Sequence, residues 1–307
     1  MSEAVQAPVA PVRAKPAATA TAAGPDPTRR GGWVTRIGLA ALCLLWTVPT
    51  IGLLVTSVRP EEDVSDTGWW TAVVAPFTSG WTTTNYDQVL GGSNDMAGAF
   101  VNSITVAVPA TVLPIMFAAF AAYAFTFMEF KGRDTLFVVV VGLLVVPLQV
   151  AFVPMLELFG TNGLNITGQF LAVWLLHTGF GMPLAIYILR NYMATLPRTV
   201  IESAKIDGAS HYQTFWRLIV PMSVPALAAF AIFQFLWVWN DLLIALLFLG
   251  VTDPVVTVNL QQLLGRLGDG WQLLTAGAFV TMTVPLIVFF ALQRFFVRGL
   301  TAGSVKG

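Results

Sequence analysis

The residues of this chain that could do chemistry inside a membrane lie close together in the stretch QFLWVWNDLL. Gln234, Trp237 and Asp241 recur there at a spacing that places them on one face of a helix. Amide and carboxylate groups exchange hydrogen bonds with hydroxyl groups, and aromatic rings stack on the C–H faces of sugars. The candidate pathway residues for a neutral, hydroxyl-rich solute are therefore Gln234, Trp237, Trp239, Asn240 and Asp241. The structural alternative is that Asn240 and Asp241 hold helices together by hydrogen bonds.

The sequence contains no motif that builds a reaction centre. His177 and His211 are its only histidines, it has a single cysteine, and it lacks H-E-x-x-H, G-x-S-x-G and P-loop patterns. We therefore expect no catalytic residue, no metal site and no cofactor, and we expect that this chain does not itself hydrolyse ATP. His177 falls in an apolar run, where a hydrogen-bonded structural histidine is the expectation.

The elements that must position these residues are membrane helices. The chain has 307 residues, of which 56% are hydrophobic and only 10% charged. Its mean hydropathy is +0.74. Soluble domains carry about 25% charged residues, so this composition predicts an all-α, multi-pass membrane protein. The formal net charge of zero gives no basic field that would attract nucleic acid.

Six runs are long and apolar enough to span a bilayer. They are residues 37–58, 99–128, 135–158, 167–189, 221–250 and 273–297. Prolines such as Pro147 lie within them and are expected to kink the helices locally. If the N-terminus is inside, 14 of the 16 Lys and Arg residues fall on the inner side, and only Arg59 and Arg266 fall outside. This distribution predicts that both termini are cytoplasmic.

The chain divides into two parts by composition. Residues 1–33 are rich in Ala, Pro and Thr and cannot bury enough apolar surface to fold, so we expect a disordered cytoplasmic tail. Residues 34–307 form the transmembrane domain, and residues 190–220 are its largest inner loop. Each charge of this loop would cost about 2.5–3.5 kcal/mol at mid-bilayer, which keeps the loop in the cytoplasm.

The inner loop carries strong helix start and stop signals. Pro197 suits the first turn of a helix, and Arg198, Glu202 and Lys205 follow on one face of it. Gly208 suits the left-handed residue that ends a helix. We therefore expect a short charged helix and a tight turn.

A second helix is predicted after the turn, because Ser210 and Gln213 have the spacing of a capping box. Its apolar stripe is formed by Tyr212, Phe215, Trp216 and Ile219. We expect this stripe to pack on the bundle while the charged helix faces a partner. The alternative is a helix pair that only anchors the loop to the membrane surface.

The segment IESAKIDGASHYQTFWRLIVPMSVPAL resembles the EAA motif of permease subunits from bacterial ABC importers. That motif reads approximately E-A-A-x-x-D-G-A, with an aromatic residue and a proline downstream. The matching residues are Glu202, Ala204, Asp207, Gly208, Ala209, Phe215 and Pro221. Ser203 departs by replacing the first alanine, and because serine is also small, close packing is expected to survive. The resemblance implies that the matching residues before Pro221, together with Ser203, form a coupling helix that docks in a groove of a cytoplasmic ATPase.

Further segments extend the resemblance over nearly all of the chain after residue 35: NSITVAVPAT, AAYAFTFMEFKGRD, LWVWNDLLIALLFL and QRFFVRGLTAGSVKG. They are similar to malG-like permease subunits of carbohydrate ABC importers, most of all to permeases for α-glucosides. The resemblance implies a type I importer permease fold in the bacterial inner membrane. It also implies that Arg298, Gly303 and Lys306 contact the ATPase, although the basic residues satisfy a positive-inside anchor equally well.

The resemblance implies a set of partners around this chain. They are a second homologous permease, two copies of a cytoplasmic ATPase, an extracytoplasmic sugar-binding protein and the membrane lipid. The outer loops 59–98 and 251–272 are candidates for meeting the binding protein, with plain solvated loops as the alternative. Other cargoes, such as a polyol or glycerol phosphate, fit the same architecture. A secondary carrier would need ion-coupling groups and internal repeats, and a membrane enzyme would need a reactive set of residues.

Overall fold

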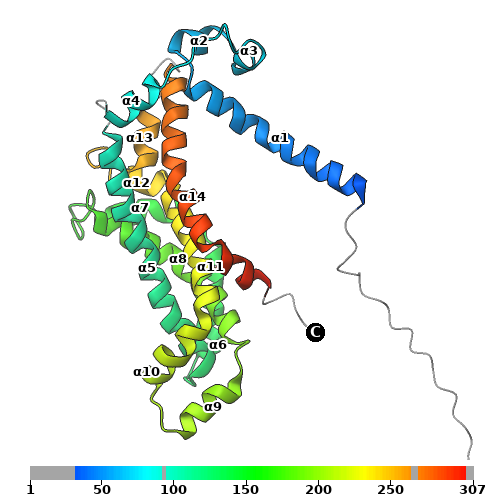
Figure 1. Ribbon diagram of the computed structural model, residues 1–307. Coiled ribbons are helices and arrows are strands. Elements are labelled where there is room, and N and C mark those ends of the chain that lie inside the picture. The colour runs from blue at the N-terminus through cyan, green and yellow to red at the C-terminus, as the bar shows by residue number, and fades with distance from the viewer. Residues whose placement is uncertain (1–31, 92–94, 264–268, 302–307) are drawn as a thin grey trace, which may run out of the picture. The chain divides into compact units, whose positions relative to one another are not determined.

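The computed structural model describes residues 32–91, 95–263 and 269–301 of the chain. These residues form helices and connecting turns with no strand among them, which confirms the all-α class (Figure 1). Five helices are long and apolar enough to cross a membrane, and a bent helix pair gives a sixth span if it counts as one. The five are α1 (Trp33–Ser57), α5 (Met96–Phe127), α8 (Phe170–Met193), α14 (Trp271–Thr301) and a helix that runs from His211 through α11 (Val220–Trp239).

The chain forms two compact units, residues 1–49 and 50–307. Within the first unit, the described residues form the first part of α1, a regular helix whose side chains are exposed, including Trp46 at 76%. An apolar, uncovered helix surface of this kind suits lipid. The packing described below concerns the second unit.

Small residues bring the central helices of the second unit together. α5 packs most extensively against α8. The buried face of α5 is rich in small residues, and α8 contributes Ala172 and Ala185, while Gly181 of α8 lies against the Gln234 side chain of α11. The small buried residues of α5 include Ala99, Ser103, Ala107, Ala110, Ala118 and Ala122. Small side chains let helix backbones approach closely, which is how membrane helices gain packing contacts where water supplies no driving force.

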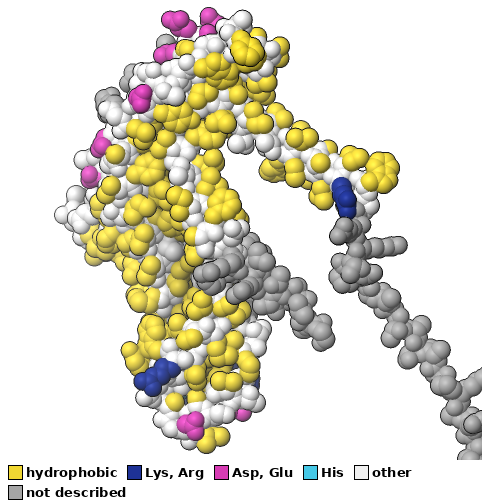
Figure 2. All heavy atoms as spheres, in the orientation of Figure 1, with side chains coloured by type: hydrophobic (Ala, Val, Ile, Leu, Met, Phe, Trp, Pro, Cys, Tyr) yellow, Lys and Arg dark blue, Asp and Glu magenta, His cyan; other side chains and the backbone are white. Residues whose placement is uncertain are grey.

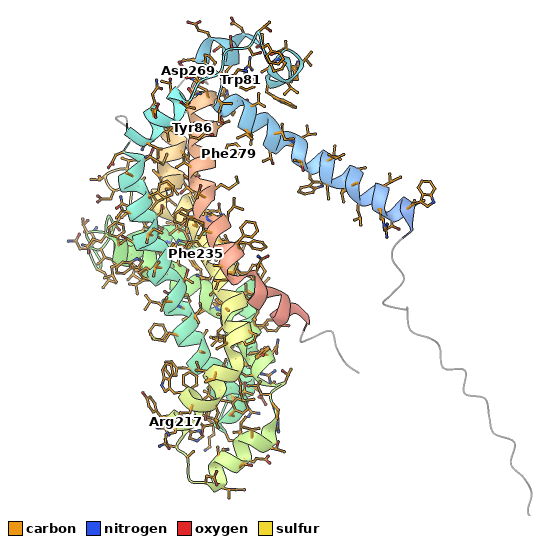
Figure 3. All side chains as sticks on the ribbon, viewed as in Figure 1. Trp81, Tyr86, Arg217, Phe235, Asp269 and Phe279 are labelled. Carbon is orange, nitrogen blue, oxygen red and sulfur yellow. The ribbon has the colours of Figure 1, made fainter. Side chains whose placement is uncertain are left out.

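Two hydrophobic clusters stabilise the two ends of this bundle. One gathers Val89, Met96, Trp239 and Phe248 near the short helices α4 (Thr84–Gly91), α12 (Leu243–Phe248) and α13 (Val256–Gln262). The other gathers Ala122, Leu189, Ile201 and Phe215 near the helices α9 (Arg198–Ile206) and α10 (His211–Thr214). Figure 3 shows Phe235 about halfway along the bundle and Arg217 toward the α10 end.

The third predicted span is bent rather than straight. It consists of α6 (Arg133–Gly142), a 3₁₀ turn η1 (Leu143–Val145) and α7 (Leu148–Phe159), and the two helical parts meet at 99°. Pro147 lies at the break, and the preceding Val146 is extended, with φ −73° and ψ 121°. Proline donates no hydrogen bond and disfavours helix at the residue before it, so the prediction of a continuous 135–158 span with only local kinking is wrong.

The fifth predicted span is also interrupted. α11 ends at Trp239, and α12 begins only at Leu243. Asn240 and Asp241 lie in the gap, where their side chains bond to backbone groups instead of continuing the helix. The prediction of one span over 221–250 is therefore wrong beyond Trp239.

The segment before α5 is folded rather than a plain loop. It contains α2 (Glu61–Asp66), α3 (Trp69–Val74) and α4, and acidic side chains gather around α2 in Figure 2. Arg59 is buried at its centre and donates hydrogen bonds to Asp63 O (2.9 Å) and Thr67 O (3.2 Å). Asn85 Nδ2 in turn donates to Arg59 O at 2.9 Å. These bonds give the segment a fixed shape that could present a surface to a partner.

Candidate functional site

The charged helix predicted in the 190–220 loop is α9. Arg198, Glu202 and Lys205 are exposed along one of its faces, while Ile201 is buried on the other. Among all described residues, the charged side chains of these three make no hydrogen bond or ion pair. The structure therefore confirms the amphipathic shape of the helix and leaves its charges available to a partner.

The turn after α9 depends on glycine. Gly208 has φ +77°, and its N–H donates to Lys205 O at 3.1 Å, while the Ala209 N–H donates to Ala204 O at 2.9 Å. Asp207 is the residue at which the helix ends. Ser203, the departure from the family pattern, donates its hydroxyl to Thr199 O at 2.9 Å within α9. The added hydroxyl is therefore already hydrogen-bonded, and it does not alter the turn.

The second helix begins as predicted. Ser210 Oγ accepts from the Gln213 N–H at 3.3 Å, and Gln213 Oε1 accepts from the Ser210 N–H at 2.9 Å, which completes the capping box. The helix then continues into the fifth span through a π-helical turn η2 (Phe215–Ile219). Pro221 follows this turn and lacks an N–H, and single-turn π-bulges occur mostly within α-helices, as here. α10 and α11 are thus parts of one helix that runs from His211 to Trp239.

The apolar stripe of the second helix is only half buried. Phe215 is buried and stacks on Phe120 with ring centroids 4.6 Å apart, as the packing prediction requires. Ile219 is also buried, and the Trp216 ring, although 42% exposed, meets the Phe120 ring edge-on with centroids 5.8 Å apart. The packing prediction is wrong only for Tyr212, which is 71% exposed. α5 continues past Phe120 to Phe127, and the Tyr123 hydroxyl lies 2.9 Å from His211 Nδ1 of α10.

The tip of the α9–α10 loop carries an uncovered apolar residue that the sequence reasoning missed. Ile206 is 86% exposed at the end of α9, directly before the turn. Exposed apolar residues at the centre of a charged surface are typical anchors of protein–protein contacts. In the sequence, the position of Ile206 between the charged residues Lys205 and Asp207 indicates that its side chain is exposed.

Gln234 and Trp237, two of the candidate pathway residues, line one cleft. Its volume is about 330 Å³, and the α6–α7 break, α8 and α11 form its walls. Phe180 and Phe233 add aromatic surface to it. The Gln234 side chain is held in place because Nε2 donates to Ala110 O at 3.0 Å. The cleft is within the size range of about 300–1,000 Å³ for small-molecule sites.

The other three candidates lie elsewhere. Trp239 is buried between Phe100 and Phe235, with ring centroids 5.9 Å and 5.7 Å away. Asn240 is exposed, and its Nδ2 donates to Leu236 O at 2.7 Å. The structure therefore does not bring Trp239 and Asn240 into the cleft: Trp239 lies on another face of α11, and Asn240 follows the end of that helix.

Asp241 caps a helix. Its Oδ2 accepts from the N–H groups of Ile244 (3.0 Å) and Ala245 (3.1 Å), the first free donors of α12. Its backbone carbonyl accepts from Thr257 Oγ1 at 2.6 Å. A second tie joins α13 to α5, where the Val256 N–H donates to Ser103 Oγ at 2.8 Å. Asp241 thus helps to hold the α12–α13 hairpin in place.

His177 is buried beside this cap. Its Nε2 lies 3.8 Å from Asp241 Oδ2, too far for a hydrogen bond, and its ring meets the Trp237 ring edge-on with centroids 5.0 Å apart. Neither ring nitrogen has a hydrogen-bond partner among the described residues. The hydrogen bond predicted for a structural histidine is therefore not made to any described residue. Both groups line a cavity of about 10 Å³, room for about one water molecule.

The His177→Phe variant is expected to unfold at a temperature no lower than the wild type. A buried polar group without a partner costs about 1–3 kcal/mol, and phenylalanine keeps the ring contact with Trp237. Thermal unfolding in detergent measures this directly. Gln234→Leu is the matched control, because it removes hydrogen bonds that are made and should lower the unfolding temperature. A clear drop for His177→Phe would show that the imidazole is bonded in the folded protein.

The candidate residues of the C-terminal segment are not placed. Gly303 and Lys306 lie outside the described residues, and Arg298 belongs to α14 without a described side chain. The proposed contact of this segment stays a prediction.

These features define a helical, multi-pass membrane protein that presents a capped helix–turn–helix at one end of its bundle. The chain belongs to the family described as the inner membrane component of binding-protein-dependent transport systems, whose model matches residues 110–302. The predicted recognition as an importer permease and the predicted inner-membrane location are thereby confirmed.

Similar proteins support the same family. The osmoprotective compounds uptake permease protein GgtD of Synechocystis sp. is 55% identical over 88% of this chain and 91% of its own length. The alpha-glucoside transport system permease protein AglG of Rhizobium meliloti is 42% identical over 92% of this chain and 100% of its own length. A crystal structure of a bacterial ABC transporter involved in alginate import contains a chain with the same fold, at a TM-score of 0.68 and 19% identity over 86% of this chain and 95% of that chain.

Proposed function

We propose that this chain is the non-catalytic permease subunit of an ATP-driven sugar importer and that the α9–α10 loop couples it to the ATPase. The observation that carries the proposal is the geometry of this loop. It exposes the unpaired charges of α9 and the apolar side chain of Ile206, and it continues without interruption into α11. Force applied to the loop therefore reaches a membrane helix that lines the Gln234–Trp237 cleft.

The proposed complex contains a second homologous permease, two ATPase subunits and an extracytoplasmic binding protein. The open cleft beside Gln234 and Trp237 would become a closed pathway only when the second permease covers it. The ordered α2–α4 segment and the α12–α13 hairpin are the surfaces proposed to meet the binding protein. The 1–33 tail and the C-terminal residues Arg298, Gly303 and Lys306 are proposed to be cytoplasmic, the latter against the ATPase.

The proposed cargo is a neutral α-glucoside or a related oligosaccharide. Aliphatic side chains, aromatic rings and one amide line the cleft, and no Lys or Arg side chain is among its lining residues. This lining favours hydroxyl groups and sugar faces over a phosphate. The similarity to the α-glucoside permease AglG points the same way. The similarity to GgtD, which is named for osmoprotective compounds, supports a small neutral solute as the second candidate.

ATP-driven uptake of a labelled α-linked disaccharide is the expected activity of the assembled complex. The complex can be purified from its own cells through a tag on this chain and placed in liposomes with its binding protein. Accumulation should require both ATP and the binding protein, and glycerol phosphate in excess should not compete. Uptake without ATP would refute the importer assignment. Competition by a small polyol but by no sugar would refute the α-glucoside cargo alone.

A further inference from the structure

A cleft of about 370 Å³ lies beside α9 and is lined by charges of both signs. Its near wall is the charged face of α9, with Arg198, Glu202 and Lys205. Its far wall is the turn that follows α5, with Glu129 and Arg133. The charged face of α9 therefore faces a second segment of the chain, which lies about 70 residues earlier in the sequence.

The charges of this cleft are largely unused within the chain. Arg133 bonds to Asp134 Oδ1 at 3.1 Å and to Met128 O at 3.4 Å, both within its own turn. Across the parts of the chain that the structure describes, the side chains of the other four make no hydrogen bond or ion pair. Such charges attract the complementary charges of a partner, and the attraction becomes stronger when the partner enters the cleft and displaces water.

We propose that the turn 128–133 is the second wall of the ATPase docking site, and that a segment of the ATPase carrying both acidic and basic side chains enters between this turn and α9. This inference rests on the proposed function and adds Glu129 and Arg133 to the contact. Anionic lipid headgroups attract basic clusters, whereas two of the five charges here are acidic. The mixed lining therefore favours a protein segment.

The second wall changes which helices the ATPase would move. The turn follows α5 directly and leads into α6, while α9 and α10 lie between α8 and α11. A partner bound to both walls would therefore contact the connections between α5 and α6 and between α8 and α11, and so act on four membrane segments at once. Because α5, α8 and α11 pack on one another, these three helices would move together.

The test is charge reversal in the turn, made in the full complex purified through a tag on this chain. Arg133→Glu is expected to weaken retention of the ATPase about tenfold, with a loss that shrinks as salt is raised. Lys131→Glu is the matched control: it makes the same reversal in the same turn, but Lys131 does not line the cleft, and retention should stay at the wild-type level. Equal behaviour of the two variants would overturn the proposal.

A photo-activated cross-linking residue at position 129 gives an independent readout that does not depend on folding of a charge-reversal variant. The expected product joins this chain to a subunit that mass spectrometry identifies as a P-loop ATPase, and position 131 should give little of it. A product with lipid, or no product at position 129, would overturn the proposal. The Ile206→Ser variant distinguishes the second wall from docking at the α9–α10 loop itself. If it releases the ATPase while Arg133→Glu does not, the second wall fails and the proposed function stands. If the wild-type complex holds no ATPase, the proposed function itself fails.

Discussion

The Gly208→Val variant is expected to lose at least about nine-tenths of ATP-driven uptake while its level in the membrane stays normal. Gly208 has φ +77°, and a left-handed backbone costs other residues about 1–2 kcal/mol, with β-branched side chains at the upper end. A Cβ at this position would meet no atom within 4 Å, so the effect comes from the backbone alone. The turn would open and displace Ile206 and the charged face of α9. About 1.4 kcal/mol at a docking site corresponds to a tenfold loss of affinity.

A matched control separates docking from general strain. Gly168 has φ +85°, and a Cβ there also meets nothing within 4 Å, but it lies between α7 and α8 rather than beside α9. Gly168→Val should therefore carry the same backbone cost, and because the Gly168 N–H donates to Phe248 O of α12 at 2.7 Å and not to α9, retention of the ATPase should stay at the wild-type level, whereas Gly208→Val should lower it. Equal losses in both variants would refute a special role for the α9–α10 turn.

Reversal of the Glu202 charge is expected to act through the same contact. Glu202 is exposed and unpaired in the described chain, so Glu202→Lys should leave the unfolding temperature unchanged while it lowers uptake and retention of the ATPase. Uptake at the wild-type level in both Glu202→Lys and Gly208→Val would remove the coupling role from this loop.

The elements of the α9–α10 loop could be predicted because their determinants are local. Pro197, Gly208 and the Ser210–Gln213 capping box act over a few residues, and each forms the turn or cap that its type favours. The membrane-spanning segments were predictable for the same reason, because the hydropathy of a segment depends only on the residues within it. What the sequence patterns could not supply was the extent of burial: the Phe120 ring contacts both Phe215, which is buried, and Trp216, which is 42% exposed.

The candidate pathway residues were predicted less well, and the cause is the break between α11 and α12. A helical face that includes Gln234, Trp237 and Asp241 assumes one continuous helix, and α11 ends two residues before Asp241. The break places Asp241 next to His177, a residue 64 positions earlier in the sequence, and no spacing rule connects the two. Asn and Asp side chains compete with the helix for backbone groups, so an Asn-Asp pair within an apolar run predicts an interruption as well as a polar face.

The Asp241→Leu variant is expected to lower uptake at least about fivefold without releasing the ATPase. The side chain caps α12 through two backbone N–H groups, and loss of a cap costs about 0.5–2 kcal/mol. α12 and α13 would then loosen at the end of the bundle opposite α9, where the binding protein is proposed to act (Figure 1). Uptake in liposomes and co-purification of the ATPase measure the two effects separately.

The Asp241→Asn variant tests whether Asp241 acts by capping α12 or through its negative charge. The asparagine oxygen can accept the same two N–H bonds, so the variant should keep uptake within about twofold of the wild type if capping is the role of Asp241. If asparagine fails as badly as leucine, the negative charge is what matters, either toward His177 or toward the solute. If leucine retains full uptake, Asp241 has neither role, and the α12–α13 hairpin must be held by its ties to α5, where Asn102 Nδ2 donates to Pro254 O at 3.1 Å and the Val256 N–H to Ser103 Oγ.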